Sequence, residues 1–135
     1  MALSFLDTNV ILRHLCDDHP EQSPRATAYF QRIEQGEIRA RTADTVVFEV
    51  VFTLQKYYQM PKAKIRETLL ALIELPGIVL PGKERLRKAF DLYVELNLSF
   101  ADAYHAVLME NLKLNEIVTF DRGFDRVVGI KRLEP

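Results

Sequence analysis

Short apolar runs alternate along the chain with longer stretches in which apolar residues recur at helical spacing. The first run, ALSFL at residues 2–6, ends at the polar cluster Asp7, Thr8 and Asn9, and a second apolar stretch, VILRHL, follows it. This order predicts a strand, a turn and a helix that begins near Asn9. Four further short runs are typical of strands, and they lie at residues 38–42, 77–80, 116–120 and 129–133.

Helices are predicted between these strands. Apolar residues recur at three- and four-residue spacing in residues 24–35 and again around Ile65 and Leu86. Ser99, with Asp102 three residues later, has the S-x-x-D form of a capping box and should begin another helix. The apolar positions of that helix are Ala103, Ala106, Val107 and Leu114.

Residues 43–58 contain the most apolar run of the chain, TVVFEVVF, and its pattern fits two structures. Alternation favours a strand, and the alternating residues are Val46, Phe48, Val50 and Phe52. A helical stripe also fits, and it consists of Val47, Val50, Val51 and Leu54. We predict a helix, because the segment is longer than a typical strand and Thr42 or Asp44 offers an N-cap.

Strands that alternate with helices indicate an α/β protein. We expect three layers, α/β/α, around a mostly parallel sheet of four to five strands. The chain has 135 residues, 48% of them hydrophobic and 27% charged. This length and composition predict a single globular domain over residues 1–135.

Charge and cysteine content restrict the cellular compartments and binding partners that we expect for this protein. The N-terminal residues lack the basic region of a signal peptide, and no run is long enough to span a membrane, so a cytoplasmic protein is expected. Cys16 is the single cysteine, which agrees with a reducing compartment. The net charge of −1 gives no global attraction for nucleic acid. Any contact with a polyanion must come from local basic clusters, and the candidates are Lys62, Lys64, Arg66, Lys83, Arg85, Arg87 and Lys88. The alternative, that these residues form solvated helix faces, is the more ordinary explanation.

Four acidic residues fall where α/β sheets place their ligand sites. Asp7 and Asp121 directly follow predicted strands, Glu49 lies in the early turns of a helix that follows a strand, and Asp102 lies in the first turn after Ser99. The carboxyl ends of parallel strands meet at one edge of the sheet, so these acids could converge there. Local roles are also open for three of them, because Asp7 and Asp102 could cap helices and Asp121 could begin a turn.

Glu49 caps nothing, and its neighbours from residue 46 to residue 52 are apolar. Its carboxylate must be paired, protonated, metal-bound or turned to water, because a bare buried charge is strongly unfavourable. A cation shared with other carboxylates is the most economical partner, and an all-oxygen ligand set suits Mg²⁺ or Mn²⁺. Two carboxylates about 4 Å apart repel by roughly 4 kcal/mol. Without metal, at least one of the four acids should therefore have a raised pKa.

The segments around these acids resemble the motifs of PIN-domain nucleases, in particular the VapC-like toxins of type II toxin–antitoxin pairs. The matching segments are LDTNVI with Asp7, VVFEVV with Glu49, SFADAYHA with Asp102 and VTFDRGFD with Asp121. The resemblance extends from residue 6 to residue 125 and implies that these four acids bind the catalytic metal. It also implies a further acid at Asp125 in some members, and polar residues that steady the site, which match Thr8, Asn9 and Thr119.

The resemblance implies Mg²⁺- or Mn²⁺-dependent cleavage of RNA phosphodiester bonds, a homodimer and a cognate antitoxin. Tyr57, Tyr58 and the helix around Ile65 are candidate interface surface, although core packing is the alternative. His105, three residues after Asp102, lies on roughly the same helix face and could contact phosphate or be an ordinary exposed histidine.

Other functions remain open at this point. A receiver-like or haloacid-dehalogenase-like phosphotransfer domain is disfavoured, because Asn9 and Pro81 stand where such sites carry aspartates. A non-catalytic metal- or partner-binding module of the same fold, or a solitary RNA-processing nuclease, fits the same residues.

Overall fold

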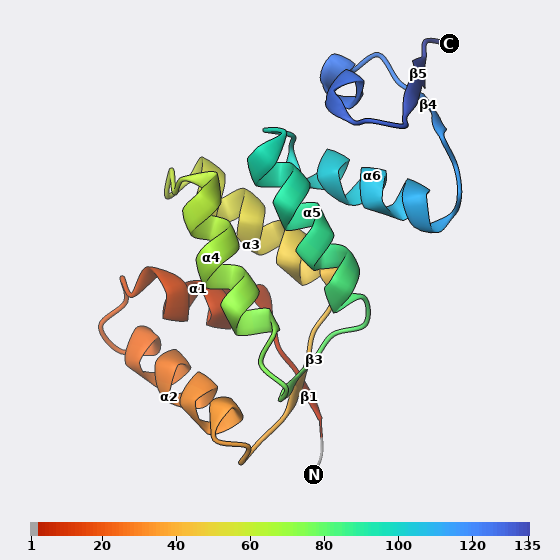
Figure 1. Ribbon diagram of the computed structural model, residues 1–135. Coiled ribbons are helices and arrows are strands. Elements are labelled where there is room, and N and C mark those ends of the chain that lie inside the picture. The colour runs from red at the N-terminus through yellow and green to blue at the C-terminus, as the bar shows by residue number, and fades with distance from the viewer. Residues whose placement is uncertain (1–2) are drawn as a thin grey trace. The chain divides into compact units, whose positions relative to one another are not determined.

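The computed structural model describes residues 3–135, which group into two compact units (Figure 1). The first unit ends at Lys83, and the second spans Glu84–Pro135. The elements of the first unit are β1 (Ser4–Phe5), α1 (Thr8–Cys16), α2 (Gln22–Glu34), β2 (Ala40–Arg41), α3 (Asp44–Lys56), α4 (Lys62–Ile73) and β3 (Ile78–Val79). Those of the second are α5 (Lys83–Glu95), α6 (Phe100–Asn111), β4 (Glu116–Val118), the 3₁₀ helix η1 (Arg122–Arg126) and β5 (Lys131–Leu133).

The α/β class is confirmed, because every strand pair among residues 3–135 is parallel and helices connect the strands. The strands are shorter than the predicted runs and form two sheets, β1-β2-β3 in the first unit and β4-β5 in the second. In the described part of the chain, no helix is both long and apolar enough to cross a membrane. The single domain over residues 1–135 stays a prediction.

Pairing of β1 with β2 sets the register of the first unit. Ser4 lies opposite Ala40, and Phe5 lies opposite Arg41. The ladder continues past the strand ends, because Leu6 N donates to Arg41 O at 2.7 Å and the Thr42 hydroxyl donates to Leu6 O at 3.0 Å. The turns into α1 and α3 therefore begin side by side.

Residues 44–56 form helix α3, as predicted, and not a strand. Its buried side chains are Val46, Val47, Val50, Val51 and Leu54. The opposite face is exposed and carries Thr45, Glu49 and Phe52 at positions i, i+4 and i+7. The buried and exposed faces of α3 thus explain the sequence pattern of this run, which also fitted an alternating strand.

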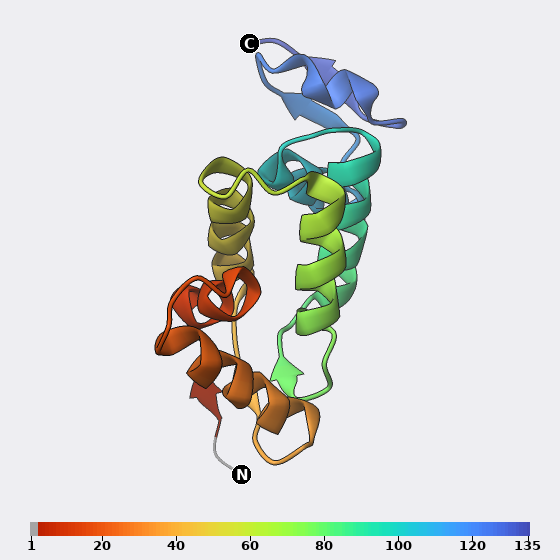
Figure 2. The same cartoon turned by 90° about the vertical axis from the view of Figure 1, so that its left-hand side faces the viewer.

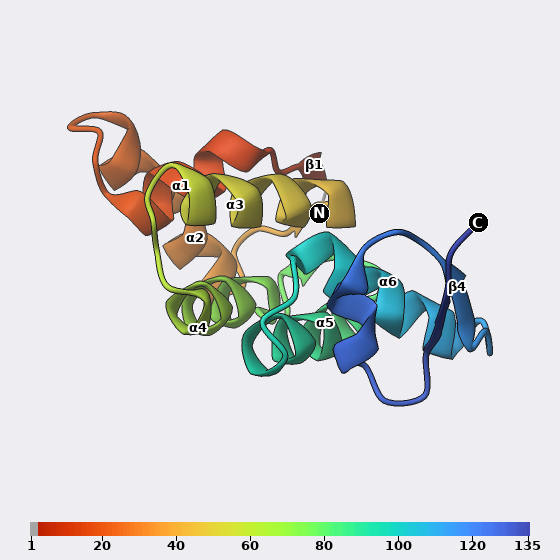
Figure 3. The same ribbon diagram turned by 90° about the horizontal axis from the view of Figure 1, so that it is seen from above.

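Helices α2 and α4 of the first unit pack against α1 and α3. Helix α1 contacts both α2 and α3, and α3 contacts α4 (Figures 2 and 3). Ile65 and Leu69 of α4 are fully buried, so core packing accounts for them. Tyr57 and Tyr58, at the end of α3, are exposed. Tyr58 also donates its hydroxyl to Asp18 Oδ2 at 2.7 Å, and this bond raises the pKa of Tyr58 to about 12.

Aromatic residues of α5 and α6 form the core of the second unit. The ring of Phe90 lies 4.6 Å from that of Phe100, and Tyr93 meets Phe100 edge-on at 5.5 Å. The predicted helix from Ser99 is confirmed, but the inclusion of Leu114 in it is wrong. The helix ends at Asn111, Lys113 adopts a left-handed φ of 58°, and Leu114 is 56% exposed.

Gly77 is a point of close approach before β3. A Cβ at this position would lie 2.7 Å from Ile33 Cγ2 and 3.1 Å from Ile33 O. Because Ile33 is buried, neither group can move away freely. Gly77→Ala should lower the free energy of unfolding by about 1–3 kcal/mol through overpacking. Urea denaturation would measure this, and an unchanged midpoint would show that the contact relaxes without strain.

Candidate functional site

Asp7 follows β1 and occupies the N-cap position of α1, but its side chain makes no capping hydrogen bond. The capping role considered for this carboxylate is therefore wrong. Within residues 3–135 the Asp7 carboxylate is exposed and makes no hydrogen bond or ion pair. It is available for a ligand, as is the exposed side chain of Asn9, two residues later.

Glu49 faces solvent despite the apolar residues around it in the sequence. Its carboxylate lies on the exposed face of α3 and accepts a hydrogen bond from Thr8 Oγ1 at 2.8 Å. The donor is almost fully buried, since Thr8 is 5% exposed. A hydroxyl held in the core therefore fixes one oxygen of Glu49 and leaves the other carboxylate oxygen for a further partner. The steadying role that the family resemblance implies for Thr8 at a metal site stays a prediction.

Asp102 and Asp121 form a carboxylate pair in the second unit. Asp102 lies in the first turn of α6, and its backbone N–H donates to the Ser99 hydroxyl at 3.1 Å, which confirms the predicted N-cap. Asp121 is close enough to the Asp102 side chain for its charge and hydrogen bonding to raise the pKa of Asp102. The predicted turn is also present, because Gly123 N donates to Asp121 Oδ1 at 2.8 Å. Thr119 steadies this turn by accepting from Asp121 N at 3.0 Å.

Burial raises the pKa of Asp102 above its ordinary value of 3.8. A hydrogen bond from Ser99 acts in the opposite direction, and the charge and hydrogen bonding of Asp121 raise the pKa further. His105 is exposed but close enough to lower it slightly. The net shift is upward, so the prediction that at least one of the four acids has a raised pKa is confirmed at Asp102.

Asp125 has a different environment. Its Oδ1 accepts from Arg132 Nε at 3.0 Å, and the same guanidinium donates to Glu134 at 2.7 Å. This contact joins η1 to β5, and sequence spacing gave no signal for it. A metal-binding role for Asp125 would have to compete with Arg132.

The site residues thus occur as two groups, Asp7, Thr8 and Glu49 in the first unit and Asp102 with Asp121 in the second. Among residues 3–135, no three His, Cys, Asp or Glu side chains are close enough together to hold a metal ion. The convergence of all four acids stays a prediction. Each group nevertheless fits a hard divalent ion, because its donors are carboxylate oxygens that are exposed or mutually repelling.

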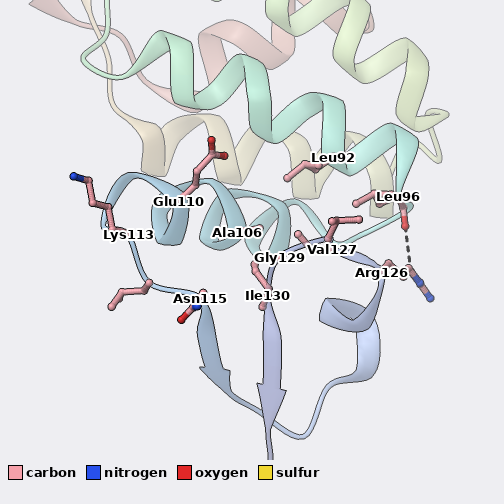
Figure 4. A pocket seen from close by; sticks show the side chains of 12 residues that line it. Leu92, Leu96, Ala106, Glu110, Lys113, Asn115, Arg126, Val127, Gly129 and Ile130 are labelled. Atoms are coloured by element: carbon pink, nitrogen blue, oxygen red, sulfur yellow. Dashed lines mark hydrogen bonds between the residues drawn. The ribbon is translucent and has the colours of Figure 1, made fainter.

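A hollow of about 600 Å³ in the second unit does not coincide with these acids (Figure 4). Leu92, Ala106, Val127 and Ile130 line it together with a few polar side chains. Arg126, which also lines it, donates to the backbone oxygens of Leu96 and Asn97. None of the predicted acids lines this hollow.

Parallel strands joined by helices, with carboxylates directly after strands and in first helical turns, define an α/β protein with an acidic site. The chain belongs to the PIN domain family, whose profile matches residues 4–130. It is similar to a VapC ribonuclease of Aquifex aeolicus (strain VF5), with 26% identity over 133 residues that cover 98% of this chain and 97% of the relative. The resemblance found in the motifs is confirmed at the level of the family.

The raised pKa of Asp102 predicts a pH-dependent stability. The folded state binds this proton more tightly than the unfolded state does, so stability falls as the pH rises above the ordinary value of 3.8. Asp102→Asn should therefore raise the Tm of the protein in EDTA near pH 7.5, on the order of a few °C, with little gain near pH 4. Thermal melts at both pH values test this. The exposed Asp17→Asn is the matched control, and an equal gain at both pH values would contradict the expectation.

Proposed function

We propose that this protein is an Mg²⁺- or Mn²⁺-dependent endoribonuclease that cleaves RNA phosphodiester bonds and acts as the toxin of a cytoplasmic toxin–antitoxin pair. The carboxylate pair of Asp102 and Asp121 carries the proposal. Membership of the PIN domain family and the similarity to a VapC ribonuclease support it.

Repulsion between Asp102 and Asp121 favours the binding of a cation at this pair. Asp102 and Asp121 cannot both ionise freely, because burial raises the pKa of Asp102 and the nearby Asp121 raises it further. A divalent cation would relieve it, whereas a structural role would be better served by an amide or a salt bridge. Ser99 and Thr119 hold the backbone at Asp102 and Asp121, so the pair is already oriented before any ligand arrives.

Asp7 and Glu49 complete the proposed metal-binding set. Asp7 contributes an unengaged carboxylate, and Thr8 orients Glu49 by its hydroxyl. When bound, Mg²⁺ or Mn²⁺ supplies activation of water and neutralisation of phosphate charge. The task of the protein side chains is to present oxygen ligands and to position the strand for in-line attack.

The proposed partners follow from the same family. A cognate antitoxin would block the acidic site, and a homodimer would cover apolar surface such as Tyr57, which is 71% exposed at the end of α3. Tyr57 and Tyr58 are exposed and can take part in such a contact, whereas Ile65 and Leu69 are buried in the core.

Removal of single acids should abolish catalysis. Asp7→Asn and Asp102→Asn should each reduce Mn²⁺-dependent cleavage of a mixed pool of cellular RNAs on the order of 100-fold or more, and relieve growth arrest on expression. Glu67→Gln, an exposed acid on α4, is the matched control and should remain active. Intact RNA after incubation of the unmodified protein with Mg²⁺ or Mn²⁺ would refute the nuclease proposal.

Metal affinity tests the role of the Thr8 and Glu49 pair. Glu49→Gln should lose measurable Mn²⁺ binding, and Thr8→Val should weaken it by about 10- to 100-fold because the carboxylate loses its orienting bond. Thr8→Ser keeps the hydroxyl and should bind as the unmodified protein does. Calorimetry gives the affinities, and circular dichroism verifies that the variants fold. Unchanged Mn²⁺ binding by folded Glu49→Gln would remove Glu49 from the site.

A further inference from the structure

A hollow of about 520 Å³ lies beside Asp7 within the first unit. Asp7 and Asn9 form one end of it, and side chains of β1, α1 and α2 form its walls. Its volume is in the range of pockets that bind small ligands or parts of larger ones. The helices α1 and α2 that form its walls also pack directly on each other.

Two arginines line this hollow, and they differ in how they are held. Arg13 of α1 donates from Nε to Gln22 Oε1 at 2.7 Å, and its Nη1 lies 3.9 Å from Asp18 Oδ1. Arg25 of α2 is exposed and makes no hydrogen bond or ion pair with any of the described residues 3–135. A guanidinium of this kind offers several donors in a plane that matches a phosphate.

Aromatic rings accompany the two arginines. Tyr29 lies four residues after Arg25 and therefore on the same face of α2. Phe5, the last residue of β1, is 62% exposed and lines the same hollow. An exposed ring such as that of Phe5, which lines the same hollow as Arg25, contributes little to the stability of the fold. Rings that stack on bases and arginines that contact phosphates are together typical of single-stranded RNA sites.

We propose that this hollow, lined by Phe5, Arg13, Arg25 and Tyr29, binds the single-stranded RNA next to the phosphate that is cleaved at Asp7. Arg25 contacts a flanking phosphate, and Tyr29 or Phe5 stacks on a base. The inference rests on the proposed ribonuclease function and names the surface that positions its substrate. Single-stranded RNA is favoured over duplex because its bases are free to stack on side chains.

Binding without cleavage tests the proposal directly. The probe is a fluorescein-labelled pool of 12-nucleotide RNAs of random sequence, titrated in EDTA and followed by anisotropy at several salt concentrations. Arg25→Ala should weaken binding about 5-fold at 0.1 M salt and reduce the slope of log K against log [salt] by about 0.7, the value for one phosphate contact on a single strand. Arg25→Lys keeps the charge and should retain the slope.

The aromatic contact has its own pair of variants. Tyr29→Leu should weaken binding about 5- to 100-fold without changing the salt slope, because stacking releases no counterions. Tyr29→Phe keeps the ring and should bind as the unmodified protein does. Arg32→Ala, on the same helix but already paired with Glu37 at 3.2 Å, is the control for loss of an α2 arginine.

The outcomes separate this inference from the proposed function. If the protein cleaves RNA but Arg25→Ala and Tyr29→Leu bind with unchanged affinity and slope, the RNA site is overturned and the hollow is left to a protein partner. An equal loss for Arg25→Ala and Arg32→Ala would also overturn it, since general charge would then be the cause. If binding depends on Arg25 while no RNA is cleaved, the hollow stands as an RNA site and the nuclease proposal fails.

Discussion

Parallel pairing of β1 with β2 is the constraint on which the first half of the candidate site depends. Hydrogen bonds beyond the last paired residues, from Leu6 N to Arg41 O and from the Thr42 hydroxyl to Leu6 O, hold the two strand ends in line. The following turns must then start side by side, which brings Thr8 within 2.8 Å of Glu49 across 41 residues of sequence. Loss of this register would separate the donor from its carboxylate, whatever the propensity of α1 and α3.

Much of the first unit is predictable from its sequence, because the decisive signals are local. The length of residues 43–58 favoured a helix over a strand, and α3 has that structure. The exposure of Glu49 was not predictable from its neighbours in the chain. Only the helical phase, which aligns Thr45, Glu49 and Phe52 on the outer face, shows that an acid within an apolar run can still face water.

In the second unit, short-range features were predictable from the sequence, but features that depend on tertiary packing were not. The N-cap at Ser99 and the turn at Asp121 are short-range features, and both were predicted. Repulsion between acids predicted a raised pKa somewhere in the site, but the choice of Asp102 depends on its burial in the folded chain. The bond of Arg132 to Asp125 and the early end of α6 before Leu114 also depend on packing and backbone geometry that no spacing rule contains.

The different anchoring of Arg13 and Arg25 has an entropic consequence. Arg13 is already confined by Gln22 and Asp18, and Asp18 is in turn held by the Tyr58 hydroxyl, so few of its rotamers remain to be lost. Arg25 is exposed and makes no hydrogen bond or ion pair with the described residues, so it keeps more of the rotamer entropy of an arginine side chain, which is about 2 kcal/mol. A ligand that enters between them meets one preorganised wall and one adaptable wall. The constrained Arg13 would fix the path of a bound RNA strand, and the mobile Arg25 would adapt to different nucleotide sequences.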